Sequence, residues 1–337
     1  GNSANNSAAE TEKTETTAAA ATSAAEETTA AEAAEDTEKN ETDEVVIATP
    51  RDAVQGSGDA YYCWEGAYVW EALTANNGGV IDPWLAKSWE HNDDCTEWTF
   101  NLRDDAYFTD GVQFDADVCL KNIERWGHGI TSTYTTLSIE KSLPNLDKME
   151  KVDDFTVKFT FTQPITTLEY VLSDYGSPMY SPNCFDEETG VISDYAIGTG
   201  PYKITDHVES EYVTLERNDN YYGEKGKVKT FKIRCIPDAE TRVSALKSGE
   251  VLGLADNGAI TMDAAKNLCD TDSNFEMDST PSHMTEYIMF NDKNEYLADK
   301  RMREAFNLAT DRDSICSVIY GGLLQPAYSF LSTQSTF

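Results

Sequence analysis

The stretch from Ile81 to Val118 constrains the fold more than any other part of the chain, because its apolar residues follow a strand period and it leads directly into a helix period. Trp98, Phe100 and Leu102 alternate with polar residues, which is typical of a strand with one buried face. Asp110-Gly111 then favours a tight turn, since glycine accepts a positive φ at little cost. The pattern predicts a strand that runs into a turned corner.

A helix is predicted directly after this corner. Asp115 is a residue type that caps helices, and the apolar residues that follow it recur at helical spacing. The stripe comprises Val118, Cys119, Ile123 and Trp126. Strand, turn and capped helix within one short stretch indicate mixed α and β packing. Packing explains nearly all of these residues, and few of them are candidates for catalysis or binding.

The same two periods predict elements elsewhere in the chain. Further strands are expected at residues 44–49, 157–161, 212–217, 229–236 and 286–291. Further helices are expected at residues 239–249, 300–310 and 311–320. A chain of 337 residues with this mixture of elements indicates an α/β protein of about two domains.

Residues 1–43 contain no aromatic residue, no Val, Ile or Leu and no Pro, and they are rich in Ala, Thr and Glu. Such a segment cannot bury enough apolar surface to offset the entropy lost on ordering. It is therefore predicted to be a disordered acidic tether. Order is expected to begin at the strand that starts at Glu44.

The formal net charge of −34 argues against nucleic acid as a partner, because phosphate binding needs clustered Lys and Arg. No apolar run approaches the ~20 residues that a membrane span requires. The motifs GxSxG, HExxH and GxxxxGK[ST] are absent from the sequence. The 4 histidines are scattered, and the 7 cysteines show no CxxC or Cys/His spacing. We therefore expect no enzyme activity, no catalytic residue, no metal site and no cofactor.

A series of motifs carries a resemblance to a known family. PWLAKSWE followed by WTFNLRDDAYFTDGVQFDADV opens the series, and IGTGPYKI, LERNDNYYG, IPDAETRVSALKSGE and KRMREAFNLATDRDSI follow in that order. Together they resemble the extracytoplasmic solute-binding proteins of peptide/nickel-type ABC importers, the oligopeptide- and dipeptide-binding family. The resemblance covers the chain from about Val45 to its end.

The resemblance implies a two-lobed α/β architecture of the type II periplasmic-binding-protein kind with an extra inserted domain. Residues 44–73 with 198–280 would form lobe I, residues 74–197 the inserted domain, and residues 281–337 the start of lobe II. Resembling chains continue past the point that matches Phe337, so lobe II is expected to be incomplete and the chain truncated. Four apolar side chains there are then expected to be incompletely covered: Met302, Phe306, Ile315 and Ile319.

The resemblance also indicates where a ligand would bind. The segment that leaves the first strand lines the ligand cleft in such proteins, which makes Tyr61, Tyr62 and Cys63 candidates, with Tyr134 as a further one. Aromatic walls bury ligand surface with few rotatable bonds, and backbone groups can bind a peptide by strand addition. The partners of a peptide's charged ends are expected to lie beyond Phe337.

The expected function is extracytoplasmic capture of di- and oligopeptides for delivery to an ABC permease. An oligosaccharide or a nickel complex are alternative ligands of the same fold, and a cell-surface adhesion or scaffold module is an alternative of another class. The resemblance further implies an N-terminal lipid anchor on the outer face of the cell membrane, and a monomer when the protein is full length.

Overall fold

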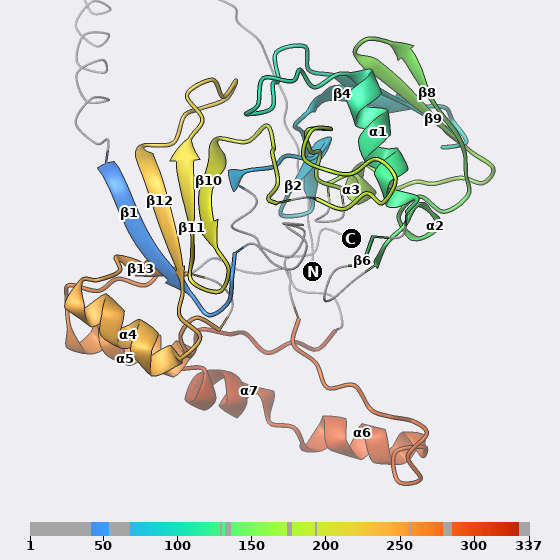
Figure 1. The fold of residues 1–337 in the computed structure, drawn as a ribbon. Helices are drawn as coiled ribbons and strands as arrows, with labels where there is room; N and C mark the ends of the chain where they lie inside the picture. Colours follow the sequence, from blue (N-terminus) through green and yellow to red (C-terminus); the bar gives the residue numbers. More distant parts are fainter. Residues whose placement is uncertain are drawn as a thin grey trace, which may run out of the picture. The chain divides into compact units, whose positions relative to one another are not determined.

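The computed structural model describes residues 42–53, 68–128, 130–131, 136–173, 177–192, 194–255, 258–278 and 285–329. Two sheets account for most of the described strands (Figure 1). The larger sheet has five strands in the order β10-β11-β12-β1-β13. Its strands are β1 (Thr42–Thr49), β10 (Tyr202–Val208), β11 (Tyr212–Arg217), β12 (Val228–Cys235) and β13 (Gly253–Leu254). Strand β1 runs parallel to β12 and β13, while β10, β11 and β12 are antiparallel.

Alternation along β1 places apolar side chains on both faces of this sheet. Ile47 packs against the cluster that contains Val213 and Ile233, whereas its neighbour Ala48 packs against the cluster that contains Ala245. Successive side chains of a strand point to opposite faces, so the two clusters lie on opposite sides of the sheet. A strand with apolar residues on both faces is typical of a sheet interior.

Helix α4 (Ala239–Ser248) covers one of these clusters, and α5 (Met262–Thr271) follows it. Asp238 caps α4 through a hydrogen bond from the Thr241 amide. Gly249 ends it in the left-handed conformation, with φ of 76°, which glycine adopts at little cost. The predicted helix at residues 239–249 is confirmed.

The smaller sheet has four antiparallel strands in the order β4-β5-β9-β8. They are β4 (Ala86–His91), β5 (Glu97–Leu102), β8 (Leu146–Asp153) and β9 (Thr156–Phe161). Alternate residues of β5 and β9 are buried, as the period-two pattern predicts. Helix α1 (Ala116–Trp126) packs on β8 and β9, and the Asp115 carboxylate accepts the Val118 amide at 2.9 Å. The predicted strand, turn and capped helix are all confirmed here.

Short elements complete the described part of the chain before residue 280. They are the hairpins β2 (Thr74–Asn77) with β3 (Val80–Pro83) and β6 (Ile130–Thr131) with β7 (Thr136–Leu137), and the helices α2 (Ile139–Ser142) and α3 (Leu168–Val171). No helix in the described ranges is long and apolar enough to cross a membrane.

The last described part contains α6 (Lys300–Ala309), α7 (Arg312–Ser314) and the π-helical turn η3 (Ile315–Ile319). Both predicted helices are therefore confirmed, the second with a π-helical end. The strand predicted at residues 286–291 is wrong: the segment is irregular, and no strand of the described residues pairs with it. A period-two pattern forms a strand only where a neighbouring strand satisfies its backbone.

Candidate functional site

The ligand-binding residues predicted from the sequence are Tyr61, Tyr62, Cys63 and Tyr134. All four lie outside the described residues, and they stay predictions. The described chain resumes at Tyr68, shortly after the first three of them. A cluster of polar side chains is centred on Glu71 in this resumed segment, and we call it the Glu71 node.

Glu71 is fully buried, and four side chains donate hydrogen bonds to its carboxylate. Oε1 accepts from Trp84 Nε1 at 2.6 Å, from the Tyr221 hydroxyl at 2.7 Å and from the Tyr222 hydroxyl at 2.9 Å. Oε2 accepts from Thr199 Oγ1 at 2.7 Å. A buried carboxylate is tolerated only when donors replace the water that it loses, and this one is fully supplied.

Two glycines allow the chain to pack closely beside Glu71. The Gly200 amide donates to the Val69 carbonyl at 2.9 Å, and a Cβ on Gly198 would lie only 2.0 Å from that carbonyl oxygen. Any side chain at either position would collide with the backbone of residues 68–70. This close approach explains the glycines of IGTGPYKI, and it brings Thr199 against Glu71.

The two tyrosines are set by the turn that follows β11. The Asn218 amide donates to the Pro201 carbonyl at 2.7 Å, and Asn218 Nδ2 donates to the Gly200 carbonyl at 3.0 Å. The Tyr221 amide then donates to the Asn218 carbonyl at 3.1 Å. The motif LERNDNYYG is thereby folded onto IGTGPYKI, which directs both phenol groups at Glu71.

Trp84 reaches the node from the link between β3 and β4. The amides of Leu85 and Ala86 donate to the carbonyls of Ala72 and Leu73, at 3.2 Å and 2.8 Å. The segment that carries PWLAKSW therefore runs beside the residues that follow Glu71. The node thus joins three sequence motifs, of which PWLAKSW lies far from the other two in the chain.

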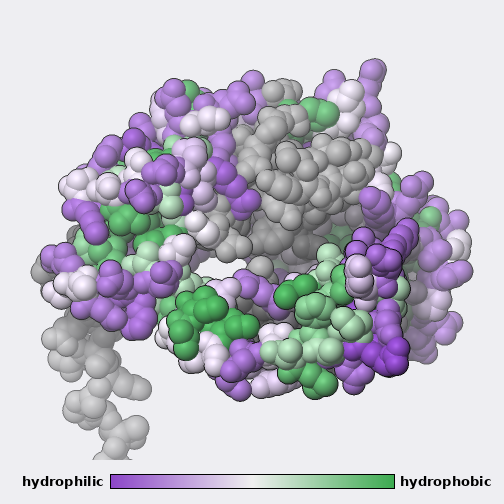
Figure 2. Space-filling model, turned by 90° about the horizontal axis from the view of Figure 1, so that it is seen from below, coloured by the Kyte–Doolittle hydropathy of each residue, from purple (hydrophilic) through white to green (hydrophobic). Residues whose placement is uncertain are grey.

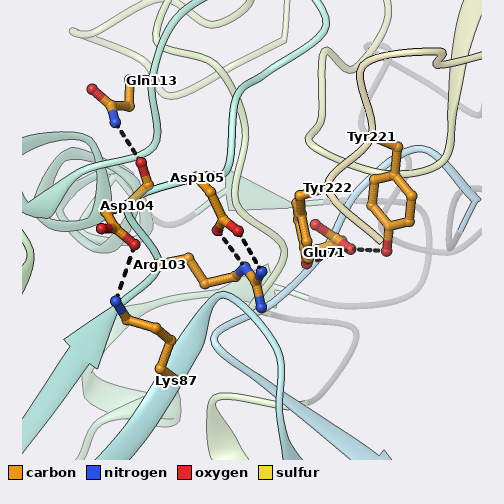
Figure 3. Close-up of polar contacts among 8 residues, drawn as sticks. All are labelled: Glu71, Lys87, Arg103, Asp104, Asp105, Gln113, Tyr221 and Tyr222. Atoms are coloured by element: carbon orange, nitrogen blue, oxygen red, sulfur yellow. Dashed lines mark hydrogen bonds and ion pairs between the residues drawn. The ribbon is translucent and has the colours of Figure 1, made fainter. Parts of the chain in front are cut away.

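An arginine lies at the outer side of the node, as Figure 3 shows. The guanidinium of Arg103 is 3.9 Å from the centre of the Tyr222 ring and donates two hydrogen bonds to Asp105, at 2.9 Å and 2.8 Å. Such a stacked cation stabilises the ring by about 1 kcal/mol. Lys87 donates to the Asp104 carboxylate and Gln113 donates to the Asp104 carbonyl (Figure 3). These two contacts fix the loop that carries Asp105.

Burial dominates the electrostatics of the node. It raises the pKa of the Glu71 carboxyl above its ordinary value, although the hydrogen bonds from Tyr221, Thr199, Tyr222 and Trp84 oppose the shift. Burial and the charge of Glu71 also raise the pKa of both tyrosine hydroxyls, so these remain protonated donors. The donors occupy both carboxylate oxygens, so the node suits positioning of the chain and not proton transfer to a ligand.

The pKa shift of Glu71 predicts a pH dependence that Glu71→Gln should remove. The folded protein holds the proton more tightly than the unfolded chain does, so the stability from this group is fully present below pH 4.5 and is lost as the pH rises through the folded pKa. We expect the free energy of unfolding of the wild type, minus that of Glu71→Gln, to fall as the pH rises from about 4 to 8. Urea unfolding of both proteins measures this difference, and a rise with pH would contradict the assigned direction.

The sequence analysis did not single out Glu71, nor the residues that surround its carboxylate, Trp84, Thr199 and the two tyrosines. The only signal was that four of these five residues lie within motifs that carried the family resemblance. Of the seven cysteines, Cys63 lies outside the described residues and the other six are free thiols. The described residues contain no group of three or more His, Cys, Asp or Glu side chains that could hold a metal ion.

Comparison with protein families identifies the class of the chain. Residues 80–337 match the model "Bacterial extracellular solute-binding proteins, family 5 Middle". The match spans most of the chain, and the protein therefore belongs to this family. The resemblance seen in the sequence motifs is confirmed.

Individual relatives agree with this assignment. The chain is 28% identical over 245 residues to the glutathione-binding protein GsiB of Escherichia coli (strain K12) and 28% identical over 247 residues to the nickel-binding periplasmic protein of that strain. Each match covers 72% of this chain and 46% of the relative. The chain thus spans about half the length of the curated relatives that it matches.

Solved structures show the same fold. The periplasmic binding protein DppA of Helicobacter pylori, in complex with the peptide STSA, has a TM-score of 0.72 at 23% identity, covering 88% of this chain and 62% of DppA. An ABC transporter substrate-binding protein of Sinorhizobium meliloti has a TM-score of 0.69 at 27% identity, covering 87% and 60%. The expected type II periplasmic-binding-protein fold is confirmed, and this chain covers part of it.

Proposed function

We propose that this chain belongs to the substrate-binding component of an ABC importer and that its ligand is a di- or oligopeptide, captured between two lobes and delivered to the permease. The observation that carries the proposal is the family match over residues 80–337. The peptide is favoured because one curated relative is named for glutathione, itself a small peptide, and two similar structures hold peptides. In the described residues, the Glu71 node supplies the rigid frame that a binding site needs.

A nickel complex is the second candidate ligand. The nickel-binding periplasmic protein of Escherichia coli (strain K12) is as similar to this chain as GsiB is. A Campylobacter jejuni protein, NikZ, solved with Ni(L-His), shares the fold with a TM-score of 0.68. Ligand binding must therefore be measured with both classes of solute.

The proposal includes the expected division into lobes. Residues 44–73 and 198–280 form lobe I, residues 74–197 the inserted domain, and residues 281–337 the start of lobe II. Two observations support this division: apart from the first two residues of β1, the five-stranded sheet takes its strands from the first set, and the four-stranded sheet takes every strand from the second. Strand β1 begins at Thr42 and not at Glu44, because its first residues pair with β12, so the predicted boundary of the tether at residue 43 is two residues too late. Residues 1–41 are proposed to tether the protein outside the membrane through a lipid anchor.

Calorimetry on the product of the complete natural reading frame tests the function. Peptides of about two to five residues should bind at micromolar or better, which corresponds to about 8 kcal/mol or more, and nickel–histidine complexes should not bind. The reverse preference would replace the peptide by nickel as the ligand. If neither peptides nor nickel complexes bind, both proposed ligands would be contradicted.

Variants of the same protein test the site and the tether. Tyr61→Ala or Tyr62→Ala should weaken peptide binding without unfolding the protein, whereas Tyr107→Ala, at an exposed tyrosine outside the proposed site, should leave it unchanged. Deletion of residues 1–41, which stops before β1, should preserve binding. If the deletion abolishes a surface attachment while peptides never bind, the adhesion or scaffold alternative is favoured instead.

A further inference from the structure

A buried arginine, Arg242, lies beside the five-stranded sheet and is separate from the Glu71 node. It belongs to α4 and is only 2% exposed. Figure 2, which views the molecule from below, shows many hydrophilic side chains on the side where α4 and α5 lie in Figure 1, yet Arg242 does not reach solvent there. A guanidinium group is retained inside a protein only where protein acceptors replace the water that it loses. The acceptors of Arg242 therefore indicate what this side chain does.

Four backbone carbonyls accept hydrogen bonds from the Arg242 guanidinium. Nη1 donates to the carbonyls of Ile236 and Pro237, at 2.6 Å and 2.8 Å. Nε donates to the carbonyl of Ala259 at 2.8 Å, and Nη2 donates to that of Gly258 at 3.3 Å. The first two carbonyls belong to the loop that follows β12, and the other two belong to the loop that follows β13. One side chain thus connects two loops whose strands lie on either side of β1.

Both loops leave the sheet at the same edge. Strand β1 is parallel to β12 and to β13, so the carboxyl ends of the three strands lie together. The Ile236 amide donates to the Thr49 carbonyl at 2.9 Å, and the Ala255 amide donates to the Ala48 carbonyl at 3.0 Å. These two bonds hold the start of each loop against the end of β1. Arg242 bonds the loops further along, so together the contacts frame the carboxyl end of β1.

The topology of the sheet makes this edge a ligand-binding position. Within the order β10-β11-β12-β1-β13, the next strand after β1 in the chain is β10, and the next strand after β12 is β13. The connections of the neighbouring strands β12 and β1 therefore leave in opposite directions. In open α/β sheets, ligands bind outside the carboxyl ends of the strands at such a point. The predicted ligand-binding residues Tyr61, Tyr62 and Cys63 also come from the segment that follows β1 in the sequence.

We propose that Arg242 is a positioning residue of the solute site: it holds the loops that follow β12 and β13 in one fixed arrangement at the carboxyl end of β1. The inference rests on the proposed function. Arg242 is buried, so it acts on the solute through the backbone of residues 236–237 and 258–259. Its planar guanidinium bonds both loops at once, which a single ammonium group cannot reproduce. Loops that are fixed before the solute arrives lower the entropy cost of binding.

Arg242→Met and Arg242→Lys in the product of the complete natural reading frame test this role. Met keeps the apolar part of the side chain and removes every donor, whereas Lys keeps the charge but has one ammonium group. Calorimetry with glutathione, the tetrapeptide STSA and a nickel–histidine complex identifies the probes that bind the wild-type protein, and the same probes are used on the variants. We expect affinity to fall about tenfold or more in Arg242→Met and about threefold or more in Arg242→Lys.

Arg125→Met is the matched control. Arg125 is also 2% exposed, and it donates to the Gly190 carbonyl at 2.6 Å, but both residues belong to the range 74–197. This variant should lose stability as the Arg242 variants do, because a buried hydrogen-bonded cation is removed, and it should keep the wild-type affinity. A purely structural role of Arg242 would give the same result as this control.

Hydrogen exchange with mass spectrometry provides a readout that needs no solute. The amides of residues 236, 238 and 258–260 should exchange at least about 10-fold faster in both Arg242 variants than in the wild-type protein. In Arg125→Met, the same amides should exchange at the wild-type rate. Such a local change would show that Arg242 fixes the two loops.

Two results would overturn the positioning role and leave the proposed function intact. One is unchanged affinity in folded Arg242 variants, and the other is exchange of the two loops at the wild-type rate. If Arg242→Met does not fold, Arg242→Lys decides the outcome by the same two measurements. Failure of the wild-type protein to bind any of the three probes would contradict the proposed function itself, and the role of Arg242 with it.

Discussion

Glu71→Ala is expected to destabilise the fold by about 3 kcal/mol or more, because it removes the acceptor shared by four buried or half-buried donors. Trp84 Nε1 and the Thr199 hydroxyl would lose their partner inside the protein, and each unpaired donor costs about 1–3 kcal/mol. The side-chain cavity adds to this loss. Urea unfolding at neutral pH measures the effect.

Two variants serve as controls for this prediction. Glu71→Gln keeps the volume and one acceptor oxygen, so its cost should be clearly smaller than that of the alanine variant. Glu90→Ala removes an exposed carboxylate from β4 and should change the unfolding free energy by less than about 0.5 kcal/mol. Equal effects at positions 71 and 90 would show that the node contributes nothing to stability.

Trp98→Ala is the second substitution for which a large loss is expected, about 3–5 kcal/mol. The ring is buried in the core of the four-stranded sheet, where it stacks against Phe100 at 6.2 Å between ring centres. Its Nε1 donates to the Ile165 carbonyl at 3.1 Å, and this acceptor would lose its partner as well. The loss of unfolding free energy in urea is the measurement.

Thr99→Ala is the matched control, because Thr99 is the next residue of β5 and points to the other face of the sheet. It should cost less than about 1 kcal/mol. If both substitutions cost the same, β5 would be stabilised equally on its two faces, and the period-two interpretation of this strand would be wrong. The melting temperatures of both variants provide an independent check: that of Trp98→Ala should fall much further than that of Thr99→Ala.

The burial pattern of individual elements could be predicted from the sequence because it depends on neighbours along the chain. Alternation of Trp98, Phe100 and Leu102 was sufficient for β5, and Asp115 followed by an apolar stripe was sufficient for α1. A strand's two faces and a helix's buried stripe follow from fixed backbone periods, whatever they pack against. The family, too, could be recognised, because its motifs lie in the linear sequence in a fixed order.

The meeting of distant residues could not be predicted in this way. Glu71 is one acid among 60 in the sequence, and nothing near it indicates that Thr199 and Tyr221 surround its carboxylate. Likewise, Arg242 of α4 is buried, and it donates to the carbonyls of Ile236 and Ala259, whereas a charged side chain on a helix is expected at the surface. The surroundings of Glu71 and of Arg242 both depend on which loops meet in the folded protein, and the periods of single strands and helices do not encode this.

The sequence by itself therefore determined the family, the periods of most strands and helices and the cap of α1. Tertiary structure alone decided which polar residues became a buried node and that residues 286–291, despite a strand pattern, do not form a strand. The physical reason is the same in both cases. Backbone and side-chain hydrogen-bonding groups take their final state from partners that are distant in the sequence, and a pattern predicts the capacity for pairing but not the presence of the partner.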